Sequence, residues 1–147
     1  MDKPARILIV DDDADVRESL KAILSDEGYL VDAAANGAEA ISKTESAVYN
    51  VALIDIRLPD MEGTELLTKI RETVPKTRKI IVTGYPTMEN AIKALNRGAD
   101  AYVLKPFDVK AVLKTIEKQL HKQREEEKFS EEKVAEFIET RVKEISE

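Results

Sequence analysis

Short apolar stretches of this sequence end in residues whose side chains could bind a metal or a phosphoryl group. The residues at these ends are Asp11, Asp12, Asp55, Thr83 and Lys105. Clustered carboxylates repel one another, which raises their pKa values unless a cation joins them. Mg²⁺ would remove that repulsion, because it prefers oxygen ligands and is often completed by a phosphate oxygen. The residue types therefore indicate a phosphoryl-binding site, provided that the fold brings them together.

Each side chain has a chemical role in such a site. Asp55 is placed as the nucleophile, since a carboxylate can attack phosphorus and form an aspartyl phosphate. Lys105 would hold one phosphoryl oxygen with a compact positive charge, and the Thr83 hydroxyl could hydrogen-bond another. Taken singly, each residue has an ordinary structural interpretation as a helix cap, a loop lysine or a strand-end threonine. Their convergence at one edge of a sheet is what distinguishes the functional interpretation.

The elements that must position these residues alternate along the chain. Buried strands are predicted over 6–10, 29–33, 51–55, 79–83 and 101–104, where short apolar runs end in polar residues. Helices are predicted over 15–27, 37–46, 64–72, 88–97 and 108–124. Such alternation indicates an α/β fold, a doubly wound parallel sheet with helices on both faces. The carboxyl ends of its strands share one edge, where ligands bind in sheets of this kind.

The composition excludes several other classes of site. A chain of 147 residues suits one domain, and its net charge of -6 argues against nonspecific nucleic-acid binding by the whole surface. There is no cysteine, so disulfides and thiolate metal sites are ruled out. The single histidine, His121, lies in a charged helical stretch, which argues against a histidine-based metal site. The sequence has no long apolar segment and no signal-like start, so we expect a soluble cytoplasmic protein with no membrane contact.

In their order and spacing, these motifs resemble the receiver domain of response regulators, the phosphorylated partners of sensor histidine kinases in two-component signalling. The resemblance spans residues 6–123 and includes the chemotaxis-regulator type. The elements that carry it are Val10-Asp11-Asp12, Asp55 with the loop to Pro59 and Gly63, Thr83-Gly84 and Lys105-Pro106-Phe107. It implies a flavodoxin-like sheet of five parallel strands in the order 2-1-3-4-5, with an extra helix at the C-terminus of this chain.

Carried over by position, the resemblance makes Asp55 the phosphoacceptor. Asp11 and Asp12 become the acidic pair that holds Mg²⁺, with Asp12 binding directly and Asp11 through water. The Arg57 backbone carbonyl becomes a further metal ligand beside Asp55. The residues assigned to catalysis are Asp55, Thr83 and Lys105, and the last two bind phosphoryl oxygens.

The resemblance also implies a switch. Tyr102 matches the family's switch aromatic, expected to turn inward as Thr83 moves toward the phosphate and to reshape the face made by the fourth helix, fifth strand and fifth helix. In the family that the chain resembles, side chains at the positions of Arg57 and Tyr85 tune the rate of phosphate loss by admitting or blocking the attacking water. The domain would catalyse phosphotransfer and its own dephosphorylation, in a phosphorelay, without being a conventional enzyme.

The implied partners are a histidine kinase as phosphodonor, a downstream protein or attached output module, and a possible homodimer. We expect no direct nucleic-acid binding by this chain. The sequence divides into a receiver domain over 1–123 and a tail over 124–147, which comprises a charged linker and an amphipathic helix.

Two features of the tail define the helix. Ser130, followed by two glutamates, has the pattern of a fresh helix start. Apolar residues then recur at helical spacing, namely Val134, Phe137, Ile138, Val142 and Ile145. This helix could fold back on the domain, bind a partner or second copy, or begin a linker to a longer protein.

Other functions fit the sequence less well than a receiver domain does. An aspartyl phosphatase usually carries a second aspartate two residues after the nucleophile, where this chain has Arg57. A flavodoxin-like nucleotide or flavin binder needs a phosphate-cradling loop after the first strand, where this chain has three consecutive aspartates. A receiver that no longer takes phosphate would lack a key residue, and every key position is filled.

Overall fold

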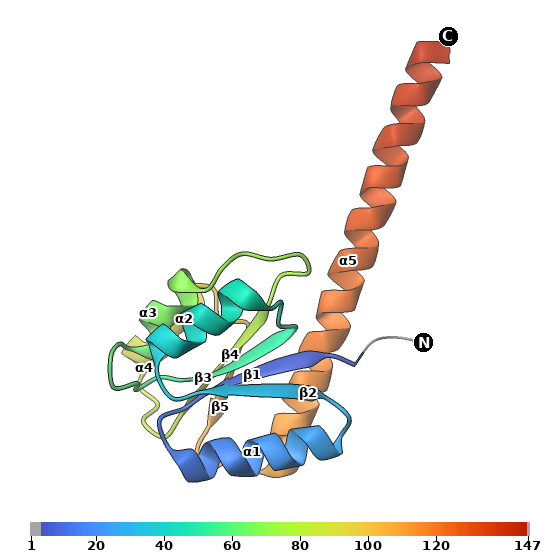
Figure 1. The fold of residues 1–147 in the computed structure, drawn as a ribbon. Helices are drawn as coiled ribbons and strands as arrows, with labels where there is room; N and C mark the ends of the chain where they lie inside the picture. The colour runs from blue at the N-terminus through green and yellow to red at the C-terminus, as the bar shows by residue number, and fades with distance from the viewer. Residues whose placement is uncertain (1–3, 147) are drawn as a thin grey trace.

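The computed structural model describes residues 4–146. Strands and helices alternate along this part of the chain (Figure 1). The strands are β1 (Arg6–Val10), β2 (Leu30–Ala34), β3 (Val51–Asp55), β4 (Arg78–Thr83) and β5 (Ala101–Leu104). The helices are α1 (Ala14–Asp26), α2 (Gly37–Ser46), α3 (Gly63–Lys69), α4 (Met88–Asn96) and α5 (Val109–Ser146). The strands form a parallel sheet in the order β2-β1-β3-β4-β5, which confirms the predicted fold and strand order.

The sheet separates two apolar cores, because successive side chains of a strand point to opposite faces. Ile7 and Ile9 of β1 pack with α1 and α5, whereas Leu8 and Val10 pack with α2, α3 and α4. Strands β3 and β4 alternate in the same way. Burial on both faces explains why these strands are continuous apolar runs in the sequence.

Local signals set several helix ends. Asp13 caps α1 by accepting hydrogen bonds from the backbone N–H groups of Asp15 and Val16. Gly28 and Gly98 follow α1 and α4 with φ angles of 94° and 95°, a left-handed conformation that favours glycine after a helix.

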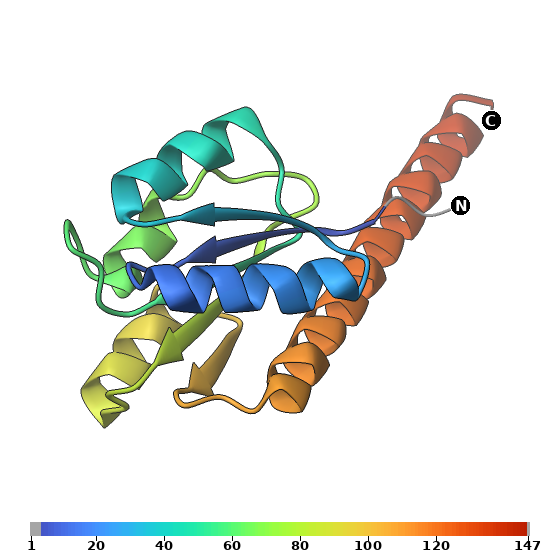
Figure 2. The same ribbon diagram turned by 60° about the horizontal axis from the view of Figure 1, so that its bottom comes forward.

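The structure differs from the prediction at the C-terminus. Helix α5 is 38 residues long and continues through Ser130, so the predicted fresh helix start there was wrong. No glycine or proline interrupts residues 109–146, and nothing in this charged stretch forces the helix to end. Residues 124–145 do not fold back on the sheet. They are exposed, and α5 runs straight past the sheet in both views (Figures 1 and 2).

A polar network anchors α5 where it leaves the domain. Arg78 Nε donates to Gln119 Oε1 at 3.0 Å, and Arg78 also pairs with Glu126 at 2.9 Å. Gln123 Nε2 donates to the carbonyls of Asn50 and Lys76 at 3.0 and 2.8 Å. These contacts fix the helix against the amino-terminal edge of the sheet. Within the described chain, no helix is apolar over enough length to cross a membrane.

The close approach of Gly63 to the end of β3 gives the first prediction. A Cβ at Gly63 would lie 2.2 Å from the Asp55 carbonyl oxygen and 2.9 Å from Ile56 Cα. Gly63→Ala should therefore lower the free energy of unfolding by about 3 kcal/mol in urea titrations, because backbone must shift. Gly84→Ala is the control, since its Cβ would meet Lys105 Cβ at an ordinary 3.7 Å. Equal stability of the two variants would contradict the packing described.

Candidate functional site

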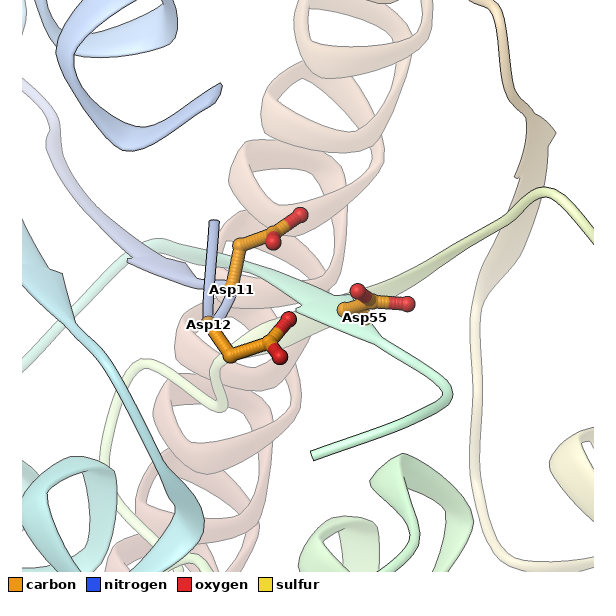
Figure 3. Close-up of side chains that lie close together, drawn as sticks. All are labelled: Asp11, Asp12 and Asp55. Atoms are coloured by element: carbon orange, nitrogen blue, oxygen red, sulfur yellow. The ribbon is translucent and has the colours of Figure 1, made fainter. Parts of the chain in front are cut away.

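The carboxyl ends of β1 and β3 bring three aspartates together. Asp11 and Asp12 follow β1, and Asp55 is the last residue of β3 (Figure 3). Among the described residues, these three offer carboxylate oxygens that all lie within 4.8 Å of one another. Asp11 and Asp55 are buried and Asp12 is exposed. Three oxygen ligands with one exposed member fit a hard divalent cation that keeps part of its water shell.

Lys105 reaches this cluster from the end of β5. Its Nζ donates to Asp11 Oδ2 at 2.7 Å and to Asp55 Oδ2 at 3.2 Å. Its backbone N–H donates to the Thr83 carbonyl at 2.7 Å, which ties the ends of β4 and β5 together. The sequence predicted that these residues converge, and the structure brings Asp11, Asp12, Asp55 and Lys105 into one site.

The charges of the site are not balanced. Burial raises the pKa of Asp55, and the nearby charge of Asp11 raises it further, against the attraction of Lys105. For Lys105, burial alone would lower the pKa, but the hydrogen bond and charge of Asp11, then those of Asp55, outweigh burial and raise it. The Lys105 ammonium carries one positive charge beside three carboxylates and bonds two of them, Asp11 and Asp55. An excess of negative charge therefore remains, which a bound cation would offset.

Thr83 and its loop complete this edge of the sheet. The Thr83 side chain is fully buried, and its hydroxyl oxygen accepts a hydrogen bond from the Tyr85 backbone N–H at 3.0 Å. The Arg57 guanidinium stacks on the Tyr85 ring, 4.0 Å from its centroid. The sequence placed both residues near the acceptor but gave no signal that they would touch.

The loop after β3 is held from two sides. Its main anchor, Asp60, was not predicted from the sequence. Asp60 accepts hydrogen bonds from the backbone N–H groups of Gly37 and Ala38 at 2.9 Å each, at the start of α2. These bonds lower the pKa of Asp60. On the other side, the Gly63 N–H donates to the Ile56 carbonyl at 2.7 Å. The loop that presents the Arg57 carbonyl is thus fixed by residues distant in sequence.

Tyr102 lies on β5 beside α4. Its ring packs against the core shared by α2, α3 and α4, and burial raises the pKa of its hydroxyl. Of the buried side-chain polar atoms in residues 4–146, the Tyr102 hydroxyl oxygen is the one that has no hydrogen-bond partner. The ring is therefore half-buried, with its hydroxyl enclosed.

Comparison with known proteins decides the family. Residues 7–117 match the family model of the response regulator receiver domain. The chain belongs to this family. It is a signalling domain of two-component systems rather than a conventional enzyme.

Relatives of this receiver domain include longer proteins. It is 36% identical over 132 residues to the transcriptional regulatory protein ZraR of Klebsiella oxytoca, covering 89% of this chain and 30% of that protein. It is 39% identical over 104 residues to the regulatory protein AtoC of Escherichia coli K12, covering 71% of this chain and 23% of AtoC. The chain thus spans less than a third of these relatives.

Solved structures agree with the fold. A CheY-like receiver domain protein from Methanospirillum hungatei JF-1 superposes with a TM-score of 0.81 at 48% identity, covering 84% of this chain and 99% of that one. NtrX from Brucella abortus superposes with a TM-score of 0.80 at 28% identity, covering 87% of this chain and 29% of NtrX.

The raised pKa of Asp55 gives the second prediction. A carboxyl group whose pKa is higher in the folded state stabilises the fold below its unfolded pKa, and that contribution is lost as the pH rises through the folded pKa. Asp55→Asn should therefore raise the free energy of unfolding at pH 7 by about 1 kcal/mol, and the gain should shrink as the pH falls toward about 4. The measurement is urea unfolding of both proteins across this pH range.

Asp26→Asn, an exposed site with the same change of charge, is the control for net charge. A loss of stability in Asp55→Asn at pH 7 would show that its attraction to Lys105 outweighs its burial.

Proposed function

We propose that Asp55 accepts a phosphoryl group from a phosphohistidine of a sensor histidine kinase in a Mg²⁺-dependent reaction. The observation that carries this proposal is the position of Asp55 at a strand end, 3.2 Å from Lys105 and within a cluster of three carboxylates. Asp55 has a nucleophilic oxygen, a cationic neighbour and an acidic pair beside it.

The donor set fits Mg²⁺. Asp11, Asp12, Asp55 and the backbone carbonyl of Arg57 would hold the ion, leaving coordination positions for water and a phosphoryl oxygen. The bound ion would offset the charge of the phosphoryl oxygens and of the acceptor. Without it, the negative charge of this cluster would repel an incoming phosphoryl group.

In the transfer, an Asp55 carboxylate oxygen attacks phosphorus as the N–P bond of the phosphohistidine breaks. The electron pair of that bond returns to the imidazole nitrogen, and Asp55 becomes an acyl phosphate. Lys105 gives up its contact with Asp55 Oδ2 and binds a phosphoryl oxygen, while the Thr83 hydroxyl donates to another. Their positions around the acceptor support the roles proposed for Asp55, Thr83 and Lys105 as catalytic residues.

A groove beside Lys105 offers an approach for the donor. It has a volume of about 600 Å³ and is lined by Val16, Gly84, Tyr85, Lys105, Pro106 and Phe107. Its walls come from the start of α1 and the loops after β4 and β5. A helix that carries the phosphohistidine could rest its apolar side chains there.

The output is proposed to pass through the α4–β5–α5 face. Thr83, drawn to the phosphate, would shift the loop to α4 and the packing around Tyr102. On this face, a groove of about 300 Å³ runs from Ala91 and Leu95 of α4 to Tyr102. Leu95 and Leu104 are exposed there, so the face offers apolar surface to a protein partner, an attached output module or a second copy.

The direct test of the acceptor is intact mass after incubation with acetyl phosphate, with and without Mg²⁺. The chain should gain one phosphoryl group only with Mg²⁺, and hydroxylamine should remove it. Asp55→Asn should stay unmodified, because an amide cannot form the acyl phosphate. A fully labelled variant would place the acceptor elsewhere, and no adduct on the wild type would indicate a receiver that works by binding alone.

The Arg57–Tyr85 stack gives a prediction about the lifetime of the phosphate. Both residues flank the acceptor, so the stacked pair should restrict attacking water. Tyr85→Ala and Arg57→Ala should each shorten the half-life of the phosphorylated form several-fold, followed by loss of the adduct mass after removal of the donor. Arg57→Lys keeps the charge but loses the planar stack, and a wild-type lifetime in that variant would refute the role of stacking.

A further inference from the structure

The face of α5 that packs on the domain continues without a break along the tail. Ile116 and Gln123 are buried, and steps of seven residues lead from them to Ser130 and Phe137. Buried Leu120 leads in the same way to Glu127, Val134 and Arg141. Residues seven apart share one side of a helix. Beyond Ser130, this side carries exposed apolar side chains, namely Val134, Phe137, Ile138 and Ile145.

A hollow lies at the foot of this exposed face. It has a volume of about 800 Å³ at the amino-terminal edge of the sheet, and Leu30, Val48, Val74 and Pro75 are among its lining residues. Glu127 of α5 also lines it, and Val74 is 90% exposed. The hollow and the exposed side of the tail therefore form one surface, open on the side of α5 that faces its own domain.

We propose that a second copy of this chain covers this surface, with the two tails packed antiparallel. A parallel pair is excluded by the domain itself. In a parallel pair the partner's residues 109–123 would lie opposite the same residues of this chain, whose face already holds Ile116 and Leu120 against the sheet. An antiparallel partner brings its C-terminal turns toward the hollow and holds its own domain at the far end.

The charges on this face of the tail also favour antiparallel packing of the two helices. Glu131 and Arg141 both lie among the apolar residues of the stripe, because Glu131 precedes Ile138 by seven residues and Arg141 follows Val134 by seven. Parallel packing would place each opposite its own copy, a like-charge contact. Antiparallel packing centred on Glu136 places Glu131 opposite the partner's Arg141, and both charges are offset.

The same register pairs the apolar side chains. Val134 lies opposite the partner's Ile138, and the two Phe137 rings meet beside the two-fold axis. Ile145 lies opposite the partner's Glu127 and so over the hollow that Val74 and Pro75 line. This association needs no phosphate, and it is independent of the proposed acceptor chemistry.

The absence of cysteine from the chain makes the direction testable. In this chain of 147 residues, Glu127→Cys and Ile145→Cys lie 18 residues apart, about 27 Å along a helix. Under mild oxidation, a mixture of the two variants should form the disulfide-linked heterodimer, and neither variant alone should link to itself. Self-linking of each variant, or no linking in the mixture, would overturn the proposal.

Light scattering over a dilution series tests the interface itself. The wild type should be a dimer, and Ile138→Glu should raise the dimer dissociation constant about 100-fold or more, since it buries an unpaired charge. Thr140→Glu, an equal change of charge on the opposite side of the helix, should leave it unchanged. Because residue 138 is exposed beyond the domain, Ile138→Glu should keep the wild-type fold. A monomeric wild type, or equal weakening by both substitutions, would refute the antiparallel dimer.

Discussion

The excess of negative charge at the carboxyl edge of the sheet is the constraint on which the site depends. Three carboxylates lie within 4.8 Å of one another, and one ammonium, that of Lys105, bonds two of them. Such a cluster is costly to bury unless a cation completes it. The two apolar cores, the close packing of Gly63 on Asp55 and the bonds of Asp60 to α2 all serve to hold these charges together.

Much of the fold and of the site follows from local patterns in the sequence. Continuous apolar runs are typical of strands buried on both faces, and in a parallel sheet their ends must share one edge. That reasoning was enough to bring Asp11, Asp55 and Lys105 together. The bonds from Asp60 to α2 and the stack of Arg57 on Tyr85 could not be predicted, because each joins residues more than 20 positions apart with no pattern in either segment.

In the tail, a local sequence signal predicted a feature that the structure does not have. Ser130 followed by two glutamates has the pattern of a helix start, yet α5 passes through it unbroken. A capping pattern begins a new helix only where the preceding residues are not already helical. The residues before Ser130 are strong helix formers, so the existing helix continues through it. The anchor at Arg78, Gln119 and Gln123 then sets the direction in which the continuous helix leaves the domain.

Calorimetric titration of Mg²⁺ into the chain tests the central claim most directly, because it measures whether the acidic cluster needs a cation. The account predicts one site in the wild type, and loss of that site in Asp12→Asn, whose exposed side chain can change without disturbing the fold. Asp15→Asn, also exposed and close by on α1, should bind as the wild type does. Absence of Mg²⁺ binding in the folded wild type, or equal binding in Asp12→Asn, would contradict the account.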